Sequence, residues 1–222
     1  SYLNCTLQML LHFYPFIQLL EDESLQQEEL VKIFKILVKN SNTTENSISP
    51  DSLVSFFRID PAIFINVWQF INDLYEKLPS ALQSLIGLFD LQNFSEPTQF
   101  DNLLSDSVVS TITGNDSFKI LLFHITPNSQ HSLFLDEQLN IKNKTFHLFS
   151  FIQIFKSTSN GQYTIMVRDS EGWILCNDTS VTVVSDSEQA RIRSLDLRIP
   201  IEVVAFVDSL DSVHFDRRPV HF

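Results

Sequence analysis

The stretch 159–178 contains the side chains whose types and spacing most suggest chemistry. It reads SNGQYTIMVRDSEGWILCND, and its alternation of apolar and polar residues is typical of a β-hairpin. Covalent cleavage of an amide bond needs a nucleophile, a histidine that takes and returns a proton, and a third side chain that orients the histidine. The stretch carries the carboxamides of Gln162 and Asn177 but no histidine. It is therefore either a structural hairpin or half of a catalytic site with something missing.

Other nucleophiles, bases and metal ligands are sparse. Cys5 and Cys176 form no C-x-x-C pair, which excludes a cysteine-based structural zinc site. No glycine-rich phosphate loop occurs, so nucleotide chemistry is not expected. Six histidines are candidates for a catalytic base: His12, His124, His131, His147, His214 and His221. A lone histidine is more often structural and none of these stands in a motif, so we expect no such base, no metal and no cofactor.

Composition excludes several classes of protein. The chain has 222 residues of which 44% are hydrophobic, enough for one domain with its own core. A net charge of −12 with scattered Lys and Arg argues against nucleic-acid binding. No apolar run reaches the roughly 18 residues of a membrane span. No signal peptide opens the chain and two cysteines fit a reducing compartment, so we expect an intracellular protein, cytoplasmic or nuclear.

The elements that must position these residues fall into two groups. Apolar residues recur at helical spacing in 1–13, 25–39 and 60–78. In the last segment Asp60 is the expected N-cap, with Pro61 at the first helical position. From residue 118 the pattern changes to that of strands. The expected strands are 118–125, 131–135, 146–155, 162–168, 172–176, 181–184 and 201–207.

Helices first and strands second indicate an α+β fold with an antiparallel sheet. We expect one domain over 1–208, with a helical lobe at 1–89, a polar connector at 90–117 and a β lobe at 118–208. Residues 209–222 are expected to form a tail.

The start of the chain resembles the first box of ubiquitin-specific proteases, the papain-like deubiquitinases. That box reads roughly C-Y-M-N-S-x-L-Q, with the nucleophilic cysteine at the start of a helix. This chain begins SYLNCTLQ. The matching residues are Tyr2, Asn4, Leu7 and Gln8, and Ser1 falls on the position of the nucleophile.

The stretch 161–181 resembles the histidine box of the same family, G-H-Y followed by W-x-x-F-D-D-x-x-V. The matching residues are Gly161, Tyr163, Trp173, Asp178 and Val181. Gln162 falls on the histidine position, and Asn177 on that of the third triad member. The strands at 120–125 and 202–207 also resemble strands of the family.

Two further regions depart from the family pattern. The segment FINVWQF, 64–70, aligns with the middle box Q-Q-D-A-x-E-F and places the amides Asn66 and Gln69 where the family has carboxylates. The zinc-bearing fingers would fall at 90–117, which has no cysteine and is too short to form them.

The resemblance implies a papain-like fold, a helical lobe packed on an antiparallel β lobe, with the fingers reduced or absent. It places the catalytic positions at Ser1, Gln162 and Asn177. It places a site frame at Asn4, Gln8, Gly161, Tyr163, Trp173 and Asp178. Because a carboxamide does not accept a proton near neutral pH, we expect an inactive domain that binds or scaffolds. The expected partners are ubiquitin, a ubiquitinated protein or other proteins of a larger chain or complex, and neither nucleic acid nor a membrane.

Two alternatives stay open. One is an active deubiquitinase with atypical catalytic residues, in which Cys5, one helical turn beyond Ser1, is a displaced nucleophile, although burial is the more common state of such a cysteine. The other is an unrelated α+β interaction domain. The sequence also leaves open whether Ser1 is natural or engineered, and what lies upstream of it.

Overall fold

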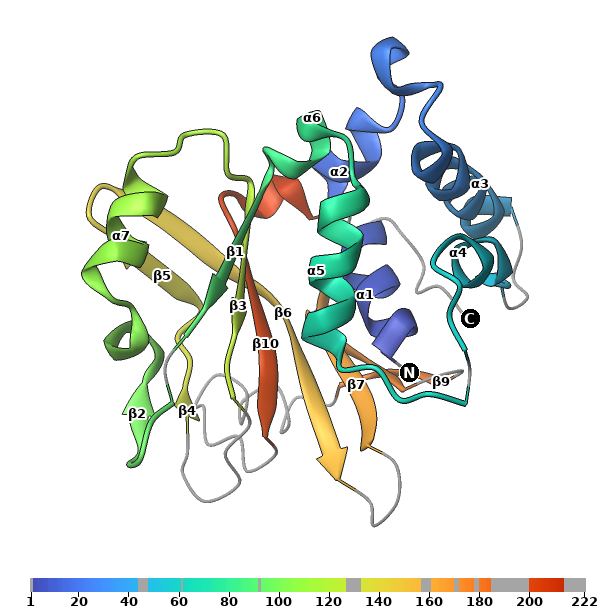
Figure 1. Ribbon diagram of the computed structural model, residues 1–222. Helices are drawn as coiled ribbons and strands as arrows, with labels where there is room; N and C mark the ends of the chain where they lie inside the picture. Colours follow the sequence, from blue (N-terminus) through green and yellow to red (C-terminus); the bar gives the residue numbers. More distant parts are fainter. Residues whose placement is uncertain are drawn as a thin grey trace.

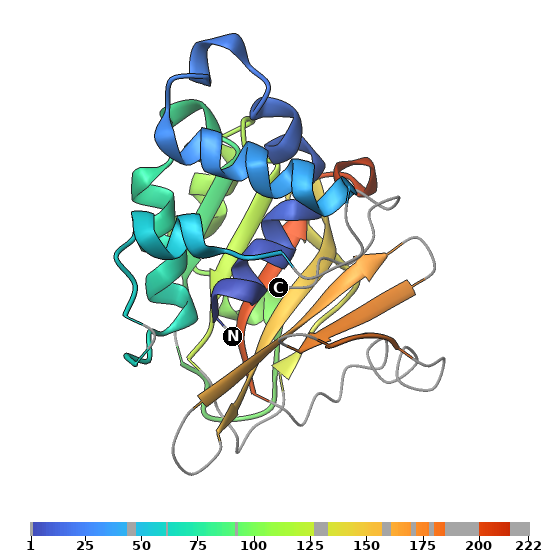
Figure 2. The ribbon, with the colours of Figure 1, turned by 90° about the vertical axis from the view of Figure 1, so that its right-hand side faces the viewer.

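A helical lobe packs against one face of a large mixed β-sheet in the computed structural model (Figures 1 and 2). The structure describes residues 2–43, 48–60, 62–91, 93–126, 133–156, 161–169, 172–177, 180–184 and 200–213. Within these ranges no helix is long and apolar enough to cross a membrane.

The helices of the first lobe arise largely where the apolar spacing predicts them. They are α1 (Tyr2–Leu11), α2 (Tyr14–Leu19), α3 (Glu29–Thr43), α4 (Asp51–Phe56), α5 (Val67–Lys77) and α6 (Ser80–Gln83), with a 3₁₀ turn η1 (Glu23–Leu25). α1 is buried along most of its length, because it lies between the other helices and the sheet (Figure 2). The helices before α7 gather on one side of the molecule (Figure 1).

The expected start of the third helical segment was wrong. α5 begins at Val67, and its N-cap is Asn66 instead of Asp60. The Asp60 side chain accepts a hydrogen bond from the backbone N–H of Ala62 at 2.8 Å, which is a local turn and no helix cap. Pro61 lies outside the described residues. This shift places Asn66 at the junction of the two lobes.

The sheet is mixed, so the expectation of an antiparallel sheet was wrong at one edge. Its strands are β1 (Ile86–Asp90), β3 (Ile120–His124), β5 (Gln138–Ile141), β6 (Lys144–Lys156), β7 (Gly161–Asp169), β8 (Gly172–Asn177), β9 (Ser180–Val183) and β10 (Ile201–Val207). The order is β1-β3-β10-β6-β7-β8-β9, with β5 beside β6. β1 runs parallel to β3, and the remaining pairs are antiparallel. A parallel neighbour requires a crossover connection, here provided by residues 91–119.

The segment 90–117, expected as a connector, contains regular elements of its own. These are β2 (Thr98–Gln99), the 3₁₀ turn η2 (Phe100–Leu103) and α7 (Asp106–Thr113). β2 pairs in parallel with β4 (Leu133–Phe134). Ser105 caps α7 by accepting from the backbone N–H of Val108 at 3.3 Å. Beyond β10, η3 (Leu210–Ser212) precedes the buried Val213, which bridges to Phe13.

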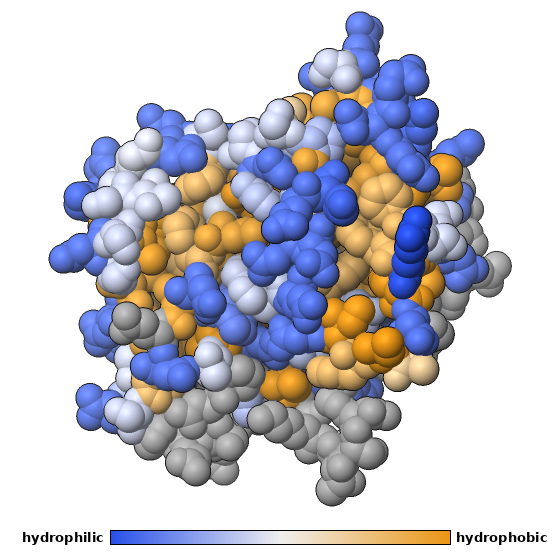
Figure 3. All heavy atoms as spheres, viewed as in Figure 1, coloured by the Kyte–Doolittle hydropathy of each residue, from blue (hydrophilic) through white to orange (hydrophobic). Residues whose placement is uncertain are grey.

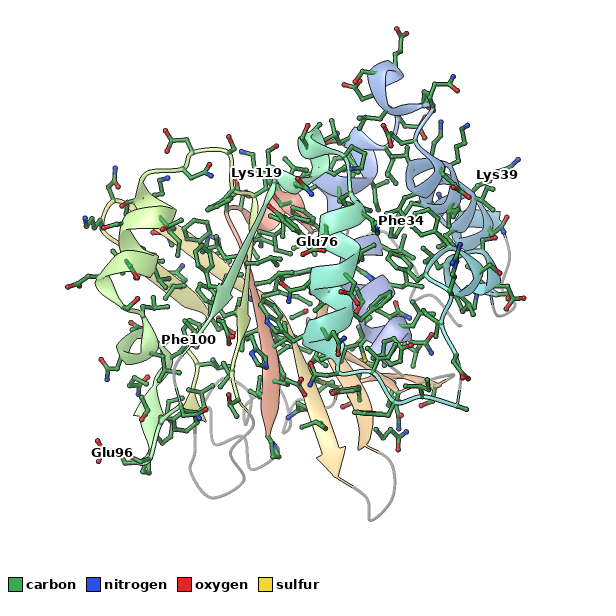
Figure 4. All side chains as sticks on the ribbon, in the orientation of Figure 1. Phe34, Lys39, Glu76, Glu96, Phe100 and Lys119 are labelled. Carbon is green, nitrogen blue, oxygen red and sulfur yellow. The ribbon has the colours of Figure 1, made fainter. Side chains whose placement is uncertain are left out.

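Two hydrophobic cores lie on opposite faces of the sheet. The first joins the helical lobe to the sheet, and in it Phe34 packs edge-to-face on Phe16 at 5.1 Å. The second lies under α7 and η2, where Phe100 meets Phe123 at 5.1 Å. Phe34 and Phe100 mark the two cores in Figure 4. Because both faces are covered, β10 is buried at every position and reads as a nearly continuous apolar run.

Candidate functional site

The hairpin of β7 and β8 lies where α1 meets the sheet. The antiparallel pairing of these strands confirms the expected hairpin. The N-terminal end of α1 lies beside β7 in both ribbon views (Figures 1 and 2). Ser1 and Asp178 lie outside the described residues. The junction is therefore described from Tyr2 onward on the helix and up to Asn177 on the hairpin.

Gln162 and Asn177 are brought together across the hairpin. The Nε2 of Gln162 donates a hydrogen bond to Oδ1 of Asn177 at 2.6 Å. Gln162 is exposed and Asn177 is half-buried. The pair joins an amide donor to an amide acceptor, and neither side chain can take up a proton near neutral pH. The hydrogen bond therefore links the open end of the hairpin, where β7 starts and β8 ends. The two amides cannot act as a general base and the residue that orients it.

The other predicted frame residues take different places. Asn4 is half-buried and Gln8 is buried, both on α1, and the backbone carbonyl of Gln8 accepts from His12 Nδ1 at 2.7 Å. Gly161 is the first residue of β7. Trp173 lies in the second core, away from the helical lobe. These positions make Gln8 and Trp173 parts of the packed interior.

Trp173 stabilises the hairpin from its far face. Its ring packs against Phe151 with centroids 5.7 Å apart, and the Arg168 guanidinium carbon lies 5.8 Å from the ring centroid. Such cation–π contacts contribute about 0.5–1 kcal/mol at exposed sites and more when desolvated. Trp173 is therefore a packing residue of the strand pair that holds Gln162 and Asn177.

Tyr163 faces the helical lobe and is fully buried. Its hydroxyl accepts from the backbone N–H of Val67 at 3.4 Å and from Nδ2 of Asn66 at 3.5 Å. Burial and the neighbouring Glu202 carboxylate both raise the pKa of Tyr163 above its ordinary value. The phenol therefore stays neutral and links the sheet to the first turn of α5.

Glu202 is a site residue that the sequence pattern did not predict. It is 1% exposed, and its Oε1 accepts a hydrogen bond from Nδ2 of Asn66. Asn66 also caps α5, because its Oδ1 accepts from the backbone N–H groups of Trp68 at 2.8 Å and Gln69 at 3.2 Å. The sequence has amides at 66 and 69, yet β10 places a carboxylate beside Asn66. A glutamate within the otherwise apolar IEVVAFV was the signal, since a charge in a buried strand needs a partner.

His124 belongs to this polar cluster. Its Nδ1 lies 2.7 Å from Oδ1 of Asp90, its Nε2 lies 3.9 Å from Oε1 of Glu202, and its ring stacks on Trp68 with centroids 5.1 Å apart. β10 and β6 separate β3 from β7, which places the two backbones about 14 Å apart at ordinary strand spacing. His124 is therefore too far from Gln162 to serve as its replacement.

The two cysteines are free thiols, and both are buried. Cys5 is 2% exposed and Cys176 is 3% exposed, which confirms the expected burial of Cys5. Burial raises the pKa of the Cys176 thiol to about 12, so it is no thiolate near neutral pH. Among the described residues no group of three His, Cys, Asp or Glu side chains could hold a metal ion.

No protein-family model matches the sequence, and no curated protein matches it. Solved structures share its fold. An essential yeast splicing factor matches with a TM-score of 0.65 and 13% identity, over 94% of this chain and 67% of that chain. The yeast SAGA Ubp8/Sgf11/Sus1/Sgf73 DUB module bound to ubiquitin aldehyde contains a chain that matches with a TM-score of 0.63 and 12% identity, again over 94% and 67%.

A second structure of the Ubp8-Sgf11-Sgf73-Sus1 SAGA DUB module matches with a TM-score of 0.62 and 12% identity, over 94% of this chain and 65% of that chain. The chain thus spans about two thirds of the length of these structures. At such identities the likeness shows the fold alone. That fold is a mixed α+β arrangement that fits a papain-like, deubiquitinase-like architecture.

Proposed function

We propose that the chain is a ubiquitin-specific-protease-like domain that binds or scaffolds and does not cleave. One observation carries this proposal: an amide, Gln162, donates to a second amide, Asn177, where the resemblance places a histidine base and its orienting partner. The frame of helix and hairpin persists, while the groups that would move protons are replaced.

The chemistry explains why the replacement is decisive. General acid–base transfer contributes about 10²–10⁴-fold to such reactions, and losing one key member of a triad already removes most of the rate. The resemblance puts a hydroxyl at Ser1 in place of a thiol, and a serine needs a strong neighbouring base to attack. Gln162 cannot supply that base. With Ser1, Gln162 and Asn177 at the triad positions, the domain is inactive.

The proposed partner is ubiquitin or a ubiquitinated protein, besides other proteins of a larger chain or complex. The shared fold supports this choice, since one matching structure is a DUB module bound to ubiquitin aldehyde. The net charge of −12 suits a basic partner surface. In the same proposal residues 1–208 form one domain, in which 90–117 stand in place of the fingers.

A restoration experiment tests the catalytic part of the proposal. We expect no turnover of a fluorogenic ubiquitin C-terminal substrate by the parent chain, and turnover in a Ser1→Cys/Gln162→His variant extended upstream of residue 1. Ser1→Cys alone is the matched control and is expected to stay silent, because it lacks the base. Turnover by the parent that disappears in Ser1→Ala would reject the proposal.

Titration calorimetry tests the binding part. Ubiquitin is titrated into the parent chain at high micromolar concentration, with heat of binding as the expected result. The absence of binding would remove ubiquitin as the partner and leave scaffolding of other proteins.

A further inference from the structure

β1 lies at an edge of the sheet, and among the described residues no strand pairs with its outer side. It pairs in parallel with β3 along its whole length and is the first strand in the sheet order. The carbonyl of Leu85 and the N–H of Leu91 both bond to β3, at 3.1 and 3.0 Å. Because successive residues of a strand turn their backbone groups to alternate sides, Leu88 and Asp90 present theirs away from β3.

This edge lacks the features that usually keep sheet edges from pairing. Native edge strands carry lysine, proline or a bulge, or are covered by another element. The sequence of β1, IGLFD, has neither lysine nor proline, and its register with β3 runs without a shift. Leu88 is half-buried and Asp90 is exposed. Apolar surface lies between α7 and α5 in Figure 3, where Figure 1 draws β1. The edge is therefore suited to accept an added strand.

The side chains of β1 decide what an added strand must carry. Leu88 packs against the first core, and Asp90 bonds to His124, whose ring stacks on Trp68. Both side chains thus lie on the face of the sheet that α5 covers. A small apolar pocket of about 10 Å³ adjoins Leu88 and is lined also by the half-buried Tyr75. A residue placed beside Leu88 therefore meets apolar neighbours, and one two positions further along meets the carboxylate of Asp90.

The charges around the edge favour a basic partner. The side chain of Asp90 is 70% exposed, and Glu76, labelled on α5 in Figure 4, is exposed as well. Near the other end of β1, Lys119 pairs with Asp208 at 3.2 Å, which compensates its charge. A second copy of this chain would bring another net charge of −12, which opposes self-pairing. The occupant is therefore a different chain with a cation beside Asp90.

We propose that the β1 edge binds an extended segment of a partner protein, which adds a strand to the sheet. The segment carries an apolar residue beside Leu88 and a lysine or arginine beside Asp90. Backbone hydrogen bonds to the edge give the affinity, and the alternate side chains give the specificity. The proposal rests on the scaffolding part of the proposed function, and it adds the surface and the chemistry of the partner.

A peptide probe tests the pairing. The probe is Thr-Val-Thr-Leu-Thr-Lys-Thr, used together with its reversed sequence because a strand can add in either direction. Each is titrated into the isotope-labelled chain, and amide resonances are followed by NMR. We expect saturable shifts at Leu88 and Asp90 with one of the two probes. Glutamate in place of the probe lysine should weaken binding about tenfold, because like charges on adjacent strands repel. No saturable shift with either probe overturns the proposal.

Methylation of the probe backbone separates strand pairing from contact through side chains alone. In a strand, alternate N–H groups face the neighbouring strand. We therefore expect N-methylation of one alternate set of probe amides to abolish binding, and N-methylation of the other set to leave it within about twofold. Equal effects of the two sets would overturn strand addition.

Variants of the chain test the same edge from the other side. Leu88→Pro removes an outward N–H, a change that edge strands tolerate, and it should abolish probe binding. Leu88→Ala is the matched control, which keeps the N–H and should keep the resonance shifts. Asp90→Lys should make the glutamate probe bind better than the lysine probe, and it serves if Leu88→Pro does not fold. Unchanged probe binding in Leu88→Pro, or an unchanged preference in Asp90→Lys, overturns the proposal.

Two further measurements separate this partner from other occupants and from ubiquitin. A parent dimer in sedimentation that Leu88→Pro dissociates would place a second copy on the edge and overturn the partner. Binding of both ubiquitin and the probe, with only the probe lost in Leu88→Pro, supports both proposals. Probe binding without ubiquitin binding supports the edge and removes ubiquitin as a partner. Ubiquitin binding without probe binding overturns the edge and keeps ubiquitin.

Discussion

The side chain of Asn66 both accepts and donates hydrogen bonds, and two substitutions can separate their contributions to the free energy of unfolding. As the N-cap of α5 it accepts from the Trp68 and Gln69 backbone N–H groups at 2.8 and 3.2 Å, which contributes about 1 kcal/mol. As a donor it binds the carboxylate of Glu202, which is 1% exposed, and a hydrogen bond to a charged group contributes about 1.5–3 kcal/mol. Asn66→Ala removes both, so we expect the free energy of unfolding to fall by about 2.5–4 kcal/mol.

Asn66→Ser isolates the second bond, because serine still caps the helix but has no amide to donate. The expected loss is about 1.5–3 kcal/mol, so about 1 kcal/mol should separate the serine and alanine variants. Urea unfolding near neutral pH, followed by tryptophan fluorescence, measures these differences, since Trp68 adjoins Asn66 and Trp173 lies in the second core. Gln69→Ala, at an exposed position of the same turn, should change stability by no more than about 0.5 kcal/mol. An alanine variant within about 0.5 kcal/mol of the parent, or equal losses for serine and alanine, would refute this reasoning.

Three other predictions follow from the packing and the titrating groups. Gly87→Ala should lower the unfolding free energy by about 1–3 kcal/mol in a urea titration. The reason is that a Cβ at this position would lie 2.8 Å from the Phe89 ring and 3.0 Å from Leu121. An unchanged midpoint would show that these two side chains move aside at no cost. The pKa of Cys176 is raised from 9.0 to about 12 by burial, so the folded chain holds this proton more tightly than the unfolded chain. The resulting stability is complete below pH 9 and is lost as pH rises from 9 toward 12, at up to about 1.4 kcal/mol per pH unit. Unfolding at pH 8 to 11 should show a shallower decline in Cys176→Ala, and equal slopes would contradict this assignment. Gln162→Ala should cost no more than about 1 kcal/mol in a urea titration, because its bond lies at an exposed site; a larger loss would reveal a structural role.

Local patterns predicted much of the fold because local physics decides it. The strands 162–168 and 172–176 alternate or run apolar as hairpin strands do, and they form β7 and β8. The apolar stripe of 25–39 gave most of α3. The strand β1 was not expected, because IGLFD follows a helix directly and its parallel pairing with β3 is set by a distant segment. Propensity carries little information about such long-range pairing.

The candidate site likewise has one part that the sequence predicts and one part that it does not. The hairpin brings Gln162 and Asn177 together through its own register, which sequence spacing can anticipate. The cluster of Asn66, Tyr163 and Glu202 combines α5, β7 and β10, and no local pattern reports that meeting. The sequence also predicted the wrong start for α5. Asp60 followed by proline is a typical N-cap pattern, but aspartate side chains accept the same kind of hydrogen bond in turns as in helix caps.

Our central claim is that the chain keeps the fold but does not cleave a substrate. The rate at which it hydrolyses a ubiquitin substrate tests this claim most directly. The parent chain, at micromolar concentration, is mixed with a fluorogenic ubiquitin C-terminal substrate, and hydrolysis is followed against buffer and against Ser1→Ala. We expect the three rates to be the same, because the amide pair of Gln162 and Asn177 offers no base. A parent rate above buffer that falls to the buffer rate in Ser1→Ala would contradict the account.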